Sequence, residues 1–260
     1  MTLIDLSRRI DEATPVYPAD PLFRSIPTAD HETDGFRVSR WTLGSHTGTH
    51  IDAPLHFFAD AEPLDAFAPE TFYSTAVVCD LRPLLDTSGP GPARITAKAL
   101  ERFEPVFERF GAVLFRTGWE THWGERDYFT AFPSIEPETA EWLADFPITL
   151  LGLDTPSLSA FGGALFDESD GDTPSWGDEP CEALLHSDAE SHRILLGRRP
   201  PVLILENLCR LDALVAVAAD TVCDEGQWER FAFRLACFPI PIGCADAAPV
   251  RAVAILPDSK

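Results

Sequence analysis

The segment HTGTHIDAPLH, residues 46–56, constrains the fold of this chain more than any other feature. Four side chains that ionise or bind metals, His46, His50, Asp52 and His56, all occupy even positions in it. An extended chain places alternate residues on one face, so these four side chains would face together. A helix would instead turn Asp52 almost opposite to His46 and His50. The segment therefore predicts an extended strand or loop with a polar face.

A straight strand cannot bring these four side chains to one place. Ten residue steps in a fully extended chain would separate His46 from His56 by roughly 33 Å. Gly48 and Pro54 disfavour a helix and permit a sharp change of direction. We therefore predict a bent strand or loop that carries its ionisable side chains toward one point.

The chemistry of these side chains indicates a metal site. Imidazole nitrogens and carboxylate oxygens are ligands that zinc, manganese and related cations prefer. An apolar flank that includes Ile51, Leu55 and Phe57 alternates with the polar positions. Burying the ionisable groups there without partners would be costly, so something must compensate them. The alternative is a solvated polar strand with no role in binding a ligand.

The segment also resembles the signature of a known family. The pattern His-x-Gly-Thr-His-x-Asp-x-Pro-x-His, complete at residues 46–56, is that of the cyclase superfamily, which includes bacterial kynurenine formamidases and isatin hydrolases. Other segments resemble that family in the same order along most of the chain: IDLSRRIDEATPVYPADP near the start, VLFRTGW (113–119), PETAEWL (137–143), LLGLDTPSL (150–158), SHRILLG (191–197), LILENL (203–208) and PVRAVAI (249–255). The chain is thereby identified as a member of this superfamily.

The resemblance implies a role for each ionisable residue of the signature. In this family the first two histidines and the aspartate hold a metal, and these correspond to His46, His50 and Asp52. The aspartate also bridges to a second ion in members with a two-metal centre. The last histidine corresponds to the family's proton-transfer residue, which is His56 here.

A second ion would take a histidine and a glutamate from later in the chain. His192 in SHRILLG and Glu206 in LILENL stand at the matching places. The chain is about two residues longer than the family pattern between them, and a turn absorbs such an insertion at little cost. Without a metal role, His192 would be a half-buried helix residue and Glu206 a carboxylate at a strand end. The resemblance implies one or two divalent ions per subunit, Zn²⁺ first and Mn²⁺ as the alternative.

Such a set of residues suits the hydrolysis of an amide. A bound metal lowers the pKa of water to about 7 and polarises a carbonyl group. His56, with an ordinary pKa of about 6.5, can take a proton from water and return it to the leaving amine. We therefore predict a hydrolase for carbon–nitrogen bonds other than peptide bonds. The simplest interpretation of these residues and the resemblance is an arylformamidase, which cleaves N-formylkynurenine to kynurenine and formate in tryptophan breakdown.

Other functions stay open at this point. A hydrolase of cyclic amides such as isatin, or a cyclase or dehydratase, could use the same scaffold. A metal-binding protein without catalysis would use the histidines structurally and keep no open coordination position. Tyr17 stands where the family often has an aromatic residue lining its pocket, although it could equally pack against the backbone turn. Phe57 and Trp119 could add apolar walls, so an aromatic small-molecule amide is the expected substrate.

Composition limits the partners of this chain. A net charge of −22 makes nucleic acid an unlikely partner, because phosphate binding needs a basic surface. No apolar run approaches a membrane span, and the opening residues lack an apolar targeting segment. Six cysteines without a C-x-x-C pair predict buried free thiols. We expect a cytoplasmic enzyme without membrane or nucleic-acid partners, and the resemblance implies a homodimer or homotetramer.

Hydrophobic periodicity predicts a mixed architecture. Strands are expected over Thr75–Leu81, Ala112–Arg116, Ile148–Leu153, Val202–Leu205, Arg230–Phe238 and Val250–Leu256. Helices are expected over Ala97–Phe110, Pro137–Asp145, Ala189–Leu196 and Leu211–Ala219. Strands dispersed among helices indicate an α/β or α+β fold. The resemblance sharpens this to a swivelling β/β/α-type single domain over residues 1–260, with a mixed central sheet or barrel and flanking helices.

One long segment stands apart from these elements. Residues 159–188 are rich in glycine and acidic side chains. A stretch of this length without regular structure predicts a long insertion loop or an ordered flap near the site. His186 has no matching position in the family and is expected to have no role in the site, and His31 and His122 are expected to be ordinary surface residues.

Overall fold

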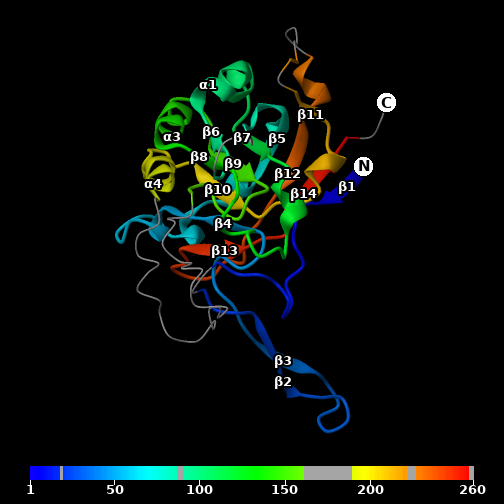
Figure 1. Cartoon of the computed structure of the whole chain (residues 1–260). Helices are drawn as coiled ribbons and strands as arrows, with labels where there is room; N and C mark the ends of the chain where they lie inside the picture. Colours follow the sequence, from blue (N-terminus) through cyan, green and yellow to red (C-terminus); the bar gives the residue numbers. More distant parts are fainter. Residues whose placement is uncertain (18–19, 87–90, 161–188, 219, 222–226, 258–260) are drawn as a thin grey trace.

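The central feature of the fold is one large mixed β-sheet (Figure 1). The computed structural model describes residues 1–17, 20–86, 91–160, 189–218, 220–221 and 227–257. The strands of this sheet are β1 (Thr2–Asp5), β4 (His50–Asp52), β5 (Tyr73–Asp80), β7 (Ala112–Arg116), β9 (Leu150–Leu153), β10 (Leu203–Glu206), β11 (Ala216–Val217), β12 (Phe233–Ala236), β13 (Ala247–Pro249) and β14 (Val253–Leu256). Across the sheet their order is β1-β14-β12-β5-β7-β9-β10-β4-β13, and β11 pairs with β5.

Parallel strands form the middle of the sheet and antiparallel strands form its two ends. Strands β5, β7, β9 and β10 pair in parallel. Antiparallel pairs join β1, β14, β12 and β5 at one end and β10, β4 and β13 at the other. The parallel strands carry continuous apolar runs, because they are buried on both faces. The expected α+β fold with a mixed central sheet and flanking helices is confirmed.

Alternation along the strands divides the core into two layers. In β7, Val113 and Phe115 face one layer, whereas Ala112 and Leu114 face the other. The first layer lies beneath the helices and also contains Phe107. Apolar side chains of the central strands pack into both layers. The middle of the sheet is therefore buried on both faces.

Helices cover one side of the sheet. They are α1 (Ala97–Leu100), α2 (Glu104–Phe107), α3 (Pro137–Ala144) and α4 (Glu190–Gly197). Figure 1 shows α1, α3 and α4 together on that side. Pro137 opens α3, a position where its missing N–H costs nothing. Helix α4 packs beside α3 and over β10, and this packing brings α4 to the end of the sheet where β4 lies.

Two of the expected helices differ from the structure. The segment Ala97–Phe110 is not continuous, because a short 3-10 turn separates α1 from α2. Pro105 lies within the segment, and a proline inside a helix removes a backbone hydrogen bond and clashes with the preceding turn.

The helix expected over Leu211–Ala219 is wrong. Its first part is a 3-10 turn, Leu211–Ala213, and β11 follows beside β5. Val215 is exposed while Val217 is buried, which is the alternation of a strand. Pairing with a buried central strand outweighs the weak helix propensity of this run. Residue 219 lies outside the described residues.

Two pairs of strands lie outside the main sheet. Strands β6 (Arg94–Ile95) and β8 (Ser134–Ile135) pair in parallel, and β2 (Arg24–Ala29) and β3 (Val38–Thr42) form an antiparallel hairpin. Figure 1 shows this hairpin extending away from the main sheet. None of these four strands was expected from the periodicity of the sequence.

Several expectations concern residues beyond the described ranges. The loop or flap was expected over 159–188. Of these residues only Ser159 and Ala160 are described, and residues 161–188, which include His186, lie outside the described residues. Free thiols are present at Cys79, Cys209 and Cys237, which are buried as expected, and at Cys244, which is exposed; Cys181 and Cys223 are not described. Over the described ranges, the structure contains no helix with the length and apolar character that crossing a bilayer requires.

Candidate metal centre

The candidate site forms around β4, a short strand that lies between β10 and β13. In the register of β4 and β10, His50 lies opposite Glu206 and Asp52 lies opposite Ile204. Because alternate residues of a strand share a face, His50, Asp52 and Glu206 project to the same side of the sheet. Helix α4 covers that side and carries His192, so the sheet register assembles the site.

The chain bends on both sides of β4, as the sequence predicts. Gly48 has a φ of 68°, in the left-handed region that favours glycine. A Cβ at this position would also lie 3.0 Å from Cγ1 of Ile10. Pro54 opens a 3-10 turn that ends at His56. These two bends fold His46 and His56 back over the strand.

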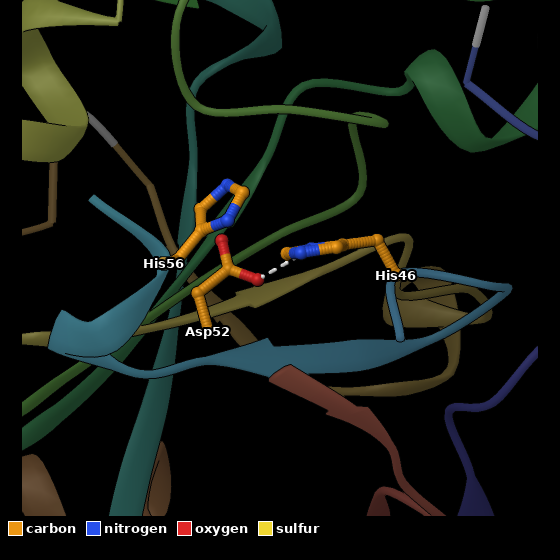
Figure 2. Close-up of side chains that lie close together, drawn as sticks. All are labelled: His46, Asp52 and His56. Carbon is orange, nitrogen blue, oxygen red and sulfur yellow. Dashed lines mark ion pairs between the residues drawn. The ribbon is translucent and has the colours of Figure 1, made fainter. Parts of the chain in front are cut away.

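One oxygen of Asp52 faces two histidines of the signature. His46 Nδ1 lies 2.9 Å from Asp52 Oδ1, and His50 Nε2 lies 3.4 Å from the same oxygen. Figure 2 shows His46 reaching Asp52 from the turn before β4, with His56 close beside both. The rings of His46 and His50 meet edge to face, with centroids 4.9 Å apart. These atoms form a first donor set of two nitrogens and one oxygen.

The other oxygen of Asp52 faces the two later residues. His192 Nε2 lies 3.8 Å from Asp52 Oδ2 and 3.1 Å from Glu206 Oε1. The second oxygen of Glu206 lies 3.4 Å from His50 Nε2. The structure thus brings all five predicted ligand residues together, with Asp52 between the two predicted donor sets. Two trios have ligand atoms within 4.8 Å of one another: His46, Asp52 and His56, and His50, Asp52 and Glu206.

The donor chemistry of this cluster fits one or two divalent cations. His50 Nε2 and both carboxylate oxygens of Asp52 are buried and make no hydrogen bond among the described residues. The contact of Asp52 with His46 is short, but it lacks the alignment of a hydrogen bond. Buried polar atoms are normally hydrogen-bonded, and three adjacent exceptions need an explanation. A cation that accepts electron pairs from all of them supplies one, because histidine and carboxylate ligands suit zinc and manganese.

The far nitrogen of each buried histidine is held by a polar partner. His50 Nδ1 donates to the carbonyl oxygen of Gly48 at 2.9 Å, so Nε2 is the nitrogen that faces the cluster. Asn207 Nδ2 donates to the same carbonyl at 3.0 Å and fixes it in place. His192 Nδ1 lies 2.7 Å from Ser159 Oγ. Partners of this kind orient the histidine ligands of metal sites.

The charges in the cluster compensate one another. Burial lowers the pKa of His46, but the carboxylates of Asp52 and Asp246 outweigh it and hold that pKa well above its ordinary value. Burial also opposes the charged form of His50, yet the adjacent carboxylates of Asp52 and Glu206 raise its pKa to about 9. For Asp52, burial raises the pKa and the neighbouring histidines lower it, with a net result well below the ordinary value. Carboxylates in this site are therefore ionised at neutral pH, as metal ligands need to be.

A cavity of about 190 Å³ opens onto the cluster, and its walls combine polar and aromatic side chains. His56 lines it beside the donor sets, with its ring centroid 4.2 Å from that of His46. Tyr17 also lines the cavity and meets Phe129 edge to face, with centroids 5.7 Å apart. Phe57 completes the apolar wall. The cavity can therefore hold a flat apolar group against the polar cluster.

Trp119 does not line this cavity, so the expectation of a third wall there is wrong. Its indole stacks on His122 with ring centroids 4.1 Å apart and donates to the carbonyl oxygen of Tyr128 at 2.9 Å. The chain turns at Gly118, whose φ is 85°, and this turn carries the indole away from the cavity. His122 Nδ1 lies 2.7 Å from Oε2 of exposed Glu125 at the surface.

Two acidic residues of the site were missed by sequence reasoning. Asp246, just before β13, lies 3.2 Å from His46 Nε2 and 3.7 Å from His56 Nδ1. Asp20 lines the cavity, and burial raises its pKa while the nearby histidines lower it. The available signals were weak: Asp20 ends the PVYPAD run that contains Tyr17, and Asp246 precedes an apolar strand.

Comparison with known proteins identifies the family of this chain. The model of a family described as putative cyclase matches residues 4–160, which is more than half of the chain. The chain belongs to the cyclase family. Its similarity to characterised members also extends over nearly the whole length. Kynurenine formamidase from Bordetella pertussis is 30% identical over 252 residues, which cover 96% of each chain. Kynurenine formamidase from Salinibacter ruber is 28% identical over 258 residues and covers 97% of each.

Solved structures of the cyclase fold are also similar to this chain. Isatin hydrolase A from Labrenzia aggregata superposes with a TM-score of 0.72 and 22% identity, covering 97% of this chain and 93% of that one. An isatin hydrolase bound to the product analogue thioisatinate gives a TM-score of 0.70 and 21% identity, covering 98% and 92%. At this level of identity the likeness shows the fold, and it agrees with the fold expected from the signature.

Proposed function

We propose that this protein is a metal-dependent amidohydrolase that cleaves N-formylkynurenine to kynurenine and formate. One observation supports the proposal most directly: Asp52 contacts histidines of both donor sets, and Asp52 and His56 line the same cavity. The similarity to kynurenine formamidases over nearly the full length supports the substrate class. Structurally similar proteins include one described as a predicted metal-dependent hydrolase, from Bacillus stearothermophilus, with a TM-score of 0.65 and 21% identity over 97% of each chain.

The proposed ligands follow from the two donor sets. His46, His50 and Asp52 would hold one divalent ion, and Asp52, His192 and Glu206 would hold the second where two are bound. Zn²⁺ is our first choice and Mn²⁺ the alternative, because both accept this mixture of nitrogen and oxygen ligands. When bound, such an ion lowers the pKa of water to about 7 and polarises a carbonyl group.

The chain's own residues would supply binding and proton transfer. His56 lines the cavity at the edge of the donor sets, where it can accept a proton from water and deliver one to the departing nitrogen. Tyr17, Phe57 and Phe129 would hold the aromatic ring of the substrate, because their rings form the apolar wall of the same cavity. The formamide group carried by that ring would then project toward Asp52.

A reconstitution experiment tests the proposal. The purified protein is stripped with a chelator, reloaded with Zn²⁺ or Mn²⁺, and given N-formylkynurenine while the absorbance of kynurenine is followed. We expect turnover in the loaded protein and none in the stripped one. Metal-loaded protein that releases no kynurenine contradicts the proposed substrate.

A panel of other substrates separates the remaining functions. Isatin opened to isatinate would assign the cavity to cyclic amides. A product formed without added water would identify a cyclase or dehydratase. Metal bound stoichiometrically with no turnover across formamides, cyclic amides and lactones would favour a binding protein. A cytoplasmic location, a role in tryptophan catabolism, a homodimeric or homotetrameric state and a single domain over residues 1–260 stay predictions.

A further inference from the structure

Asp246 occupies a position at which two histidines of the site meet one carboxylate oxygen. Its Oδ2 lies 3.2 Å from His46 Nε2 and 3.7 Å from His56 Nδ1. Ser45 Oγ donates to the same oxygen at 3.3 Å. Asp246 itself belongs to neither proposed donor set. Its carboxylate instead faces the ring nitrogen of His46 that points away from Asp52.

The side chain of Asp246 is separate from the backbone contacts that hold this part of the sheet. Its carbonyl oxygen accepts a hydrogen bond from the backbone N–H of Ala53 at 2.8 Å, which extends the pairing of β13 with β4. The carboxylate is 42% exposed. Replacing the side chain therefore leaves the β4–β13 pairing intact and opens no hole in the apolar core.

Each of the two histidines presents one ring nitrogen to this carboxylate. His46 lies between two carboxylates, with Nε2 3.2 Å from Asp246 Oδ2 and Nδ1 2.9 Å from Asp52 Oδ1. Asp246 therefore fixes the side of the His46 ring that faces the cluster. With Nδ1 of His56 toward Asp246, Nε2 of His56 is the atom left to exchange a proton in the cavity.

We propose that Asp246 is a positioning residue that sets the orientation of both His46 and His56. The inference rests on the proposed function, in which His46 binds the metal and His56 transfers the proton. One carboxylate thereby couples metal binding to proton transfer. A partner of this kind to a metal-binding histidine typically changes metal affinity or activity by about 10- to 100-fold when it is removed.

The first test measures metal affinity without reference to turnover. Stripped wild-type protein and the variants Asp246→Asn and Asp246→Glu compete for Zn²⁺ with a chromophoric chelator. We expect Asp246→Asn to bind about 10- to 100-fold more weakly and Asp246→Glu to recover part of the loss. The matched control is Asp60→Asn, which removes one negative charge from an exposed residue four positions after His56. Equal affinity in wild type, Asp246→Asn and Asp60→Asn overturns the role at His46.

The second test asks whether Asp246 acts through His56. At saturating metal, we expect Asp246→Asn to lower kcat by about 10- to 100-fold with little change in KM. In a His56→Ala background the same substitution should not lower kcat further, although its effect on metal affinity should persist. An equal loss of kcat in both backgrounds overturns the role at His56. If wild type itself shows no turnover, the proposed function fails, and the affinity measurement still decides the role at His46.

Discussion

Two buried carboxylates of this protein, Asp52 and Asp154, are in opposite chemical situations. Asp154 follows β9 and is satisfied by the chain: it accepts hydrogen bonds from the N–H of Thr117 at 2.9 Å, the hydroxyl of Thr117 at 2.6 Å and the N–H of Gly118 at 2.8 Å. Asp52 is equally buried, yet neither of its oxygens makes a hydrogen bond among the described residues. It is surrounded by imidazole nitrogens and a second carboxylate.

The pKa shifts of the two carboxylates are also opposite in direction. Burial raises the pKa of Asp154 to about 6, against the effect of its hydrogen bonds. The histidines around Asp52 hold its pKa well below the ordinary value despite its burial. The difference teaches how to read a buried acid. Hydrogen-bond donors from the backbone and a hydroxyl group indicate that it holds a loop, whereas histidine and carboxylate groups around oxygens without hydrogen-bond partners indicate a place for a cation.

Removing the charge of Asp52 should have the largest effect. We expect Asp52→Asn to lose its bound metal and essentially all turnover, because both donor sets depend on this residue. Asp154→Asn should keep both properties. Metal analysis by mass spectrometry and assays on both variants check this. Full metal content with normal turnover in Asp52→Asn would contradict our interpretation of the buried cluster.

The next effect separates proton transfer from metal binding. We expect His56→Ala to keep its metal and to lose turnover by roughly 10²- to 10⁴-fold, the usual contribution of a general acid or base. Metal content and kcat measured on one preparation test the point. Unchanged turnover would remove His56 from the mechanism. Loss of metal would instead move it into the first donor set.

A smaller effect concerns stability. Because a ligand that binds only the native state stabilises it, Zn²⁺ at 100 times its Kd should raise the free energy of unfolding by about 2.7 kcal/mol. The gain should be the same in Asp154→Asn and absent in Asp52→Asn. Urea unfolding with and without the metal measures it. An equal gain in both variants would mean that the ion binds elsewhere.

The smallest effect is the dependence of stability on pH near Asp154. Its pKa lies above the ordinary value of 3.8, so its contribution is fully present below pH 3.8 and is lost as the pH rises through about 6. A shift of two units corresponds to at most about 3 kcal/mol. Since asparagine does not titrate, the difference in unfolding free energy between wild type and Asp154→Asn should vary over pH 4 to 6. Parallel curves would refute the shift.

Features of the candidate site could be predicted when the residues that determine them lie close together in the sequence. Spacing, Gly48 and Pro54 together predicted the bend around β4, because those constraints act within eleven residues. Asp246 could not be singled out. It is one of 42 acidic residues, and its place beside His46 arises only when β13 pairs with β4. A single acid far along the chain carries no local pattern that could identify it.

The same distinction applies to the fold. Buried runs such as Ala112–Arg116 were predicted at their correct bounds, because a strand covered on both faces must be apolar throughout. The run Leu211–Ala219 was assigned wrongly, since its short strand is stabilised by a neighbour that the sequence does not reveal. The β2–β3 hairpin shows weak alternation because most of its side chains are exposed.

The position of β4 between β10 and β13 has a consequence for biosynthesis. The ribosome makes His50 early, but Pro249, the residue paired with it in β13, emerges about 200 residues later. At 5 to 20 residues per second this is a delay of roughly 10 to 40 seconds. Until β10 has emerged, about 40 residues before Pro249, the early histidines have no partner strand, and the nascent segment depends on its own solubility or on a chaperone. The ion must then be acquired late, once translation is almost complete.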